Sequence, residues 1–234
     1  MKRALDPGSE VRGAMEGKAG LNESLLNFFM DNYRPASIGL VGTRDPVGLA
    51  IRQSLRALRE DGKPSSWSHC FLLGDLRWDR RGPQRGKSRS LYIFESDIQI
   101  SLYYPQLRNG AQESWVGKWC TERVENAAVV DFELTEAERE DVLSFALQLV
   151  DEQAYYPLQE LIGTWWSIIS KRQWQPNWLD DPHALYCSAF VRHCYREAGK
   201  DFGGAEVSLS NTTPEDIAQR GIESGKLLRF LSAG

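Results

Sequence analysis

The chain has 234 residues, of which 41% are hydrophobic and 26% are charged. This length and composition are typical of a globular protein, and we expect one domain over 21–234 after a disordered N-terminal tail over 1–20. The formal net charge of −4 gives no electrostatic reason to expect a nucleic-acid ligand.

Membrane and export signals are weak throughout the sequence. No apolar run approaches the roughly 20 residues of a membrane span, and the polar N-terminus lacks the apolar core of a secretory signal. We therefore expect a protein made in the cytoplasm and without a transmembrane segment. Any export would use a leaderless route, and peripheral contact with a membrane stays an alternative.

Helices and short strands alternate in the first third of the chain. Apolar residues at helical spacing predict a helix over 22–33, and a short apolar run predicts a strand over 36–43. The next helix is predicted over 45–61, with Asp45 as its N-cap. A second strand is predicted over 68–75.

The remaining elements complete a pattern of central strands flanked by helices. Residues 91–104 are predicted to form two strands bent near Ser96, and residues 126–134 another strand. Helices are expected over 135–152, 157–174 and 188–198 and from Thr213, before a last strand over 227–231. This order is typical of an α+β fold, in which helices pack on an antiparallel or mixed sheet.

The cysteines and histidines do not form a recognisable metal or disulfide pattern. The four cysteines, Cys70, Cys120, Cys187 and Cys194, include no Cys-x-x-Cys pair, and the three histidines lack zinc-type spacing. We predict no disulfide in a reducing cytoplasm, no metal site and no organic cofactor.

Cys187 has the position of a reactive thiol, at the start of the helix predicted over 188–198. Unpaired amides and the positive end of the helix dipole favour a thiolate there, and the same amides can donate to an oxyanion. The small residues Ser188 and Ala189 would leave room for a substrate. Simple packing in the core is the alternative role for this cysteine.

A thiolate needs a partner base, and His69, near the start of a predicted strand, is the best candidate. Glu95 ends the next predicted strand, so antiparallel pairing of the two strands would bring it beside His69 and orient the imidazole. Asp97 replaces Glu95 if the strand boundary shifts by two residues, and His183 is an alternative base.

Five short motifs occur in a defined order along the chain. They are WSHCFLLGD at 67–75, YIFES at 92–96, YYP at 155–157, YCSAFV at 186–191 and TTPEDIA at 212–218. In this order the sequence resembles the circularly permuted, YiiX-like branch of the NlpC-type papain-like cysteine hydrolases, over roughly residues 36–231. The chain departs from that pattern at Phe71, where the family often has glycine, and at Ala189, where an acidic residue is familiar.

The resemblance implies a papain-like fold with a circularly permuted chain order and a set of site residues. Cys187 matches the nucleophile, His69 the base and Glu95 the orienting residue. A tyrosine near the site matches Tyr156 or Tyr155, and we favour Tyr156 because it precedes Pro157.

The resemblance also implies a substrate class. Amide hydrolysis of peptidoglycan peptides ranks first, in an antibacterial effector with an immunity protein as its partner. Lipid acyl hydrolysis or transfer is the alternative, for which Trp165 and Trp166 would form an apolar wall or lid rather than a buried helix face. The basic loop over 77–89 would attract anionic groups or is simply solvated. A non-catalytic binding module is the third possibility.

Overall fold

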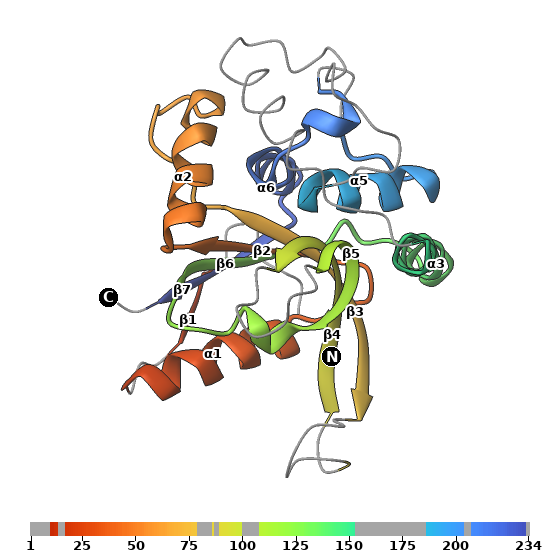
Figure 1. The fold of residues 1–234 in the computed structure, drawn as a ribbon, viewed down its shortest axis with the longest axis horizontal. Coiled ribbons are helices and arrows are strands. Elements are labelled where there is room, and N and C mark those ends of the chain that lie inside the picture. Colours follow the sequence, from red (N-terminus) through yellow and green to blue (C-terminus); the bar gives the residue numbers. More distant parts are fainter. Residues whose placement is uncertain are drawn as a thin grey trace.

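The structure, a computed structural model, describes residues 10–13, 17–78, 86, 89–99, 108–152, 186–203 and 207–232. Its centre is a sheet of seven described strands in the order β1-β7-β6-β2-β3-β4-β5 (Figure 1). The strands are β1 (Glu10–Gly13), β2 (Ile38–Thr43), β3 (His69–Trp78), β4 (Arg89–Gln99), β5 (Arg108–Trp115), β6 (Val124–Val130) and β7 (Leu227–Ser232). Six of them form a continuous antiparallel sheet, and β1 pairs with β7 in parallel.

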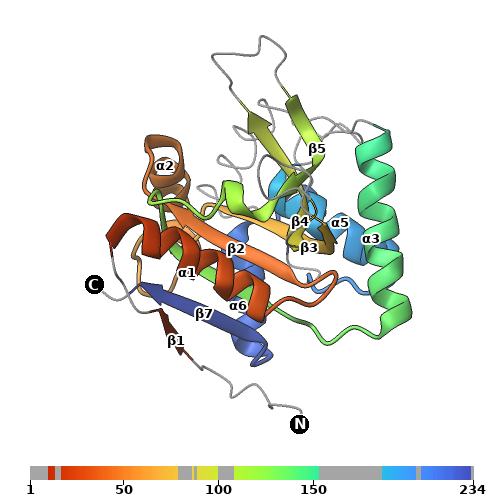
Figure 2. The ribbon, with the colours of Figure 1, turned by 90° about the horizontal axis from the view of Figure 1, so that it is seen from below.

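Helices cover both faces of this sheet. The described α-helices are α1 (Gly17–Asp31), α2 (Pro46–Ser54), α3 (Glu136–Asp151), α5 (Cys187–Glu197) and α6 (Pro214–Glu223). The short 3₁₀ helices are η1 (Leu55–Leu58), η3 (Val116–Lys118) and η4 (Leu209–Asn211). Figure 2 shows α1 across one face, with α5 and α6 behind the sheet. The structure is thus of the α+β class, as the order of predicted elements indicated.

Successive side chains of β3 point to opposite faces of the sheet and divide the core into two clusters. Cys70 and Leu72 pack toward α5, whereas Phe71 and Leu73 pack toward α1. This division follows from the two-residue period of a strand, which sends successive side chains to opposite faces. His69 lies on the same side as Phe71, with their ring centroids 6.3 Å apart.

The helix starts follow local capping chemistry. The Asp45 carboxylate accepts from the Gly48 amide at 3.0 Å, and Thr135 and Glu138 form the expected capping box of α3. Thr213 forms a second capping box with Asp216 at the start of α6. In contrast, the N-cap of α5 is Tyr186, whose side chain makes no capping hydrogen bond.

The structure differs from the predicted elements in several places. Residues 89–99 form one strand that continues through Ser96. Ser96 is fully buried in the sheet, so this polar residue does not mark the bend that was predicted there. The polar strand β5 was not predicted at all. The helix predicted over 45–61 ends at Ser54 and continues only as η1. The expected tail over 1–20 contains β1 and the first residues of α1.

Two further expectations bear on the overall structure. Among the described residues, no helix combines the length and the apolar character needed to cross a membrane. The helix predicted over 157–174 lies outside the described residues.

Candidate active site

The structure brings His69 and Glu95 together on neighbouring antiparallel strands. His69 is the first residue of β3, and Glu95 lies in β4 on the same face of the sheet. The His69 Nε2 atom lies 3.0 Å from Glu95 Oε2. Because Glu95 occupies Nε2, the other ring nitrogen, Nδ1, is left to face a nucleophile.

The backbone before His69 is held firmly against β2. The Ser68 amide donates to the Val41 carbonyl at 2.9 Å, and the Ser68 hydroxyl accepts from the Thr43 amide at 3.0 Å. Gly42 permits this close approach, since a Cβ at that position would lie 1.9 Å from the Ser66 carbonyl oxygen. The entry into β3, and with it the position of His69, is therefore fixed by β2.

Glu95 is a fully buried carboxylate with three hydrogen-bond partners. Its Oε2 accepts from Trp119 Nε1 at 2.9 Å as well as facing His69, and its Oε1 accepts from Lys118 Nζ at 2.6 Å. Burial opposes ionisation, but His69 and Lys118 outweigh it and lower the pKa of Glu95 from 4.5 to about 2. Asp97, the alternative third residue, instead accepts from Lys118 at 2.8 Å.

Trp119 completes the surroundings of His69. Its ring stacks on the imidazole with centroids 4.5 Å apart, while its indole nitrogen holds Glu95. Lys118 and Trp119 reach this position because η3 turns sharply after β5. Gly117 is required in that turn, since a Cβ there would lie 2.1 Å from Trp115 Cζ2.

Cys187 is the first residue of α5 and interacts with His69 at the start of β3. Burial alone would lower the pKa of His69, but the Cys187 thiolate and Glu95 raise it from 6.5 to about 10. A hydrogen bond from the Cys70 thiol, together with the charge of His69, lowers the pKa of Cys187 well below 9.0. Cys187 and His69 therefore favour a thiolate–imidazolium pair, which is the nucleophilic form of a cysteine.

All three residues are buried, but Cys187 and His69 keep a small solvent exposure. Cys187 is 6% exposed and His69 8%, whereas Glu95 is 0% exposed. Part of the Cys187 and His69 surface thus reaches solvent, whereas Glu95 lies wholly in the interior.

Ser188 differs from its expected role at the substrate. Its side chain is fully buried, and its hydroxyl donates to the Thr212 carbonyl at 2.7 Å. Arg192, one turn further along α5, donates to Thr212 Oγ1 at 2.9 Å and to the Val207 carbonyl at 2.7 Å. These contacts anchor α5 to η4 behind Cys187, so Ser188 supports the helix with its side chain.

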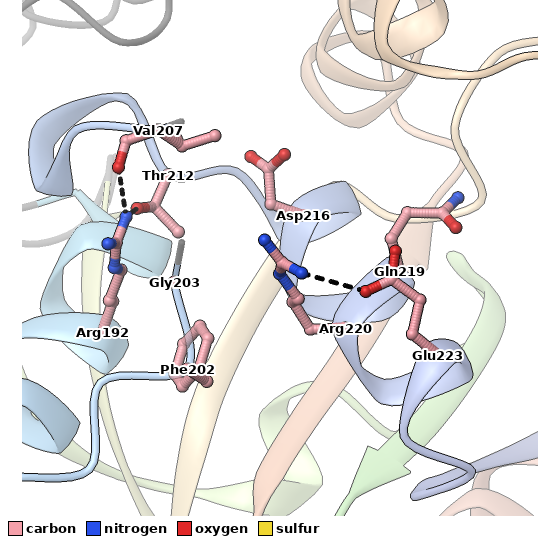
Figure 3. Close-up of a pocket in the computed structure, with 9 residues that line it drawn as sticks. All are labelled: Arg192, Phe202, Gly203, Val207, Thr212, Asp216, Gln219, Arg220 and Glu223. Atoms are coloured by element: carbon pink, nitrogen blue, oxygen red, sulfur yellow. Dashed lines mark hydrogen bonds and ion pairs between the residues drawn. The ribbon is translucent and has the colours of Figure 1, made fainter. Parts of the chain in front are cut away.

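A small pocket lies between α5 and α6, next to these anchoring contacts (Figure 3). Its two arginines are both engaged, Arg192 with Val207 and Thr212, and Arg220 with Glu223 at 3.1 Å. Cys187, His69 and Glu95 are not among its lining residues. The pocket is therefore separate from these three residues, and the side chains around it hold α5 in place.

Several predicted site residues lie outside the described residues. These are Tyr155, Tyr156, Trp165, Trp166 and His183, together with most of the basic loop.

Sequence reasoning missed four residues near the site. Lys118 and Trp119 follow a strand that was not predicted, and Cys70 was not given a role at the site. Gln112 lies directly opposite Glu95 in β5, and its buried amide nitrogen has no hydrogen-bond partner among the described residues. The Lys-Trp pair two residues after the polar segment 108–115 was the available signal for the first two.

The described residues contain no group of three or more His, Cys, Asp or Glu side chains arranged to hold a metal ion. All four cysteines carry free thiols. No protein-family model matches the chain, and no curated protein matches it significantly. The geometry of the site therefore carries the functional argument.

Proposed function

We propose that this protein is a cysteine hydrolase that cleaves an amide or ester through an acyl-enzyme. The observation that carries the proposal is the placement of Cys187 at the uncapped start of α5, paired with a His69 that Glu95 holds at 3.0 Å. The resemblance to permuted NlpC-type hydrolases, with a papain-like fold, supports the same assignment of roles.

The proposed reaction starts from the Cys187 thiolate and the protonated His69. The Cys187 thiolate attacks the carbonyl carbon, and the first-turn amides of α5 donate to the oxyanion. His69 gives its proton to the leaving nitrogen or oxygen as the carbon–nitrogen or carbon–oxygen bond breaks. A water molecule, deprotonated by His69, then cleaves the thioester and releases Cys187 as the thiolate. Glu95 keeps the imidazole oriented throughout.

The activated thiolate is tested by the rate at which iodoacetamide alkylates Cys187 as a function of pH, with the labelled peptide identified by mass spectrometry. We expect alkylation well below pH 8, and a shift of this profile toward an ordinary thiol in His69→Gln. His193→Gln is the matched control, because His193 contacts Glu197 and Arg196 on the outer part of α5. Reaction of the wild type only above about pH 8 contradicts an activated nucleophile and favours a non-catalytic binding module.

The substrate class rests on the resemblance, which puts cell-wall peptides first and lipid acyl groups second. We would incubate the protein with purified peptidoglycan and, separately, with phospholipid vesicles. Muropeptide products are expected, and products from vesicles alone would reverse the order. Cys187→Ala should reduce either activity by at least about a thousandfold. An effector delivered to rival cells, together with an immunity protein, would fit peptidoglycan cleavage.

A further inference from the structure

Lys118 joins two carboxylates at the site. Its Nζ atom lies 2.6 Å from Glu95 Oε1 and 2.8 Å from Asp97 Oδ2. It binds the oxygen of Glu95 opposite to the one that faces His69, so the two cations hold the carboxylate from both ends. The Lys118 side chain is 24% exposed, which shields this ion pair from most of the solvent.

The charges around His69 explain why such a lysine is needed. The titratable groups facing it are Cys187 from α5 and Glu95 and Asp97 from β4, and, through both carboxylates, Lys118 from η3. When His69 transfers its proton to a leaving group, the site loses one cation. Among the described residues, Lys118 is then the remaining cation that offsets the buried carboxylate, and a buried charge without an opposite charge is costly.

We propose that Lys118 is a positioning residue for the His69–Glu95 pair, which keeps Glu95 ionised and in place while His69 alternates between imidazolium and neutral imidazole. The inference rests on the proposed function, because only a catalytic histidine must release its proton in each cycle. Without Lys118, Glu95 and Asp97 together would hold the proton on His69 and slow its transfer to the leaving group.

The direct test is the titration of His69 by NMR in protein labelled with ¹⁵N-histidine and carrying Cys187→Ala, which removes the thiolate. The chain has three histidines, so His69 is assigned by the signal that is lost in His69→Gln. Lys118→Met should raise the midpoint of the His69 titration by about one pH unit, since both carboxylates lose their shared cation. Lys118→Arg keeps the charge and should restore the midpoint.

Lys226→Met is the matched control for loss of a lysine–glutamate pair. Lys226 contacts Glu133 near the junction of Val130 with Leu227, at the opposite end of the sheet from His69. If Lys118→Met is unfolded by circular dichroism, Lys118→Gln serves as the second variant. An unchanged His69 midpoint in a folded Lys118 variant, or equal shifts in Lys118→Met and Lys226→Met, would overturn the inference.

The two proposals fail in different ways. If wild-type Cys187 is alkylated like an ordinary thiol, the proposed function fails whatever the His69 midpoint does. If wild-type Cys187 is activated but Lys118→Met leaves the midpoint unchanged, only the role of Lys118 fails. A lysine that merely stabilises the fold would lower the unfolding midpoint without moving the titration of His69.

Discussion

At the level of single residues, Cys187 depends on a second cysteine as well as on His69. Cys70 is fully buried in β3, within the apolar cluster that also contains Cys187. Burial, the first cause, and the hydrogen bond to Cys187 raise the pKa of Cys70 well above 9.0, so this thiol stays protonated as a donor.

Cys70→Ala should therefore raise the pKa of Cys187, because the thiolate loses its largest stabilising contact. We expect the pH profile of alkylation to move upward by about one pH unit. Cys194→Ala is the control, since Cys194 is equally buried in the same cluster. Equal shifts in the two variants would mean that the loss of core packing, and not the hydrogen bond, is responsible.

The proposed catalytic residues could be predicted from residue type and order, whereas their supporting residues could not. Cys187 starts a helix and His69 and Glu95 lie on successive strands, which are properties visible in local sequence. The roles of Lys118 and Trp119 depend on where η3 turns after an edge strand. That turn depends on tertiary packing, including the contact between Gly117 and the Trp115 ring.

At the level of elements, the junction between β2 and β3 positions the imidazole. Gly42 lies against the backbone of Ser66, three residues before His69. A side chain at Gly42 would meet a carbonyl oxygen, which cannot move aside as a flexible side chain would. The strand end and the segment that precedes His69 would then separate.

Gly42→Ala should destabilise the protein by about 2 kcal/mol, a cost typical of overpacking, and should slow alkylation of Cys187 at neutral pH as His69 shifts. The unfolding midpoint in urea and the alkylation rate measure the two effects. Gly62→Ala is the comparison, because no atom lies within 4 Å of a Cβ there and only backbone strain is added. Wild-type alkylation in a destabilised Gly42→Ala would show that β2 does not position His69.

Elements with local signals were predicted well, and elements defined by pairing were not. The capped starts of α2, α3 and α6 match the sequence because a cap needs only residues three positions apart. β5 is polar and gains its structure from pairing with β4. β1 is too short to be recognised, and its pairing partner β7 lies at the other end of the chain.

At the level of the whole molecule, the buried charges make stability depend on pH in a defined direction. The pKa of Glu95 is lowered from 4.5 to about 2, so its contribution to stability is present above pH 4.5 and is lost as the pH falls toward 2. His69, with a raised pKa, loses its contribution as the pH rises from 6.5 to about 10. Cys187, with a lowered pKa, has the opposite slope below 9.0 and offsets much of that loss.

The loss of stability at acid pH therefore gives the clearer prediction. Between pH 4.5 and pH 2 the wild type should lose a few kcal/mol more stability than Glu95→Gln, as measured by urea unfolding at a series of pH values. Glu133→Gln, which changes an exposed carboxylate, should keep the wild-type slope. Parallel curves for the wild type and Glu95→Gln would contradict the description of Glu95 as a carboxylate held ionised by His69 and Lys118.

The distribution of the site along the chain has a consequence for the timing of its chemistry during synthesis. His69, Glu95, Lys118 and Trp119 come from one contiguous stretch, whereas Cys187 arrives with a helix almost seventy residues later. Cys70 and His69 act on the sulfur only once α5 has docked on the sheet. Before α5 docks, Cys187 is therefore an ordinary thiol, and the contacts that lower its pKa form only with the tertiary structure.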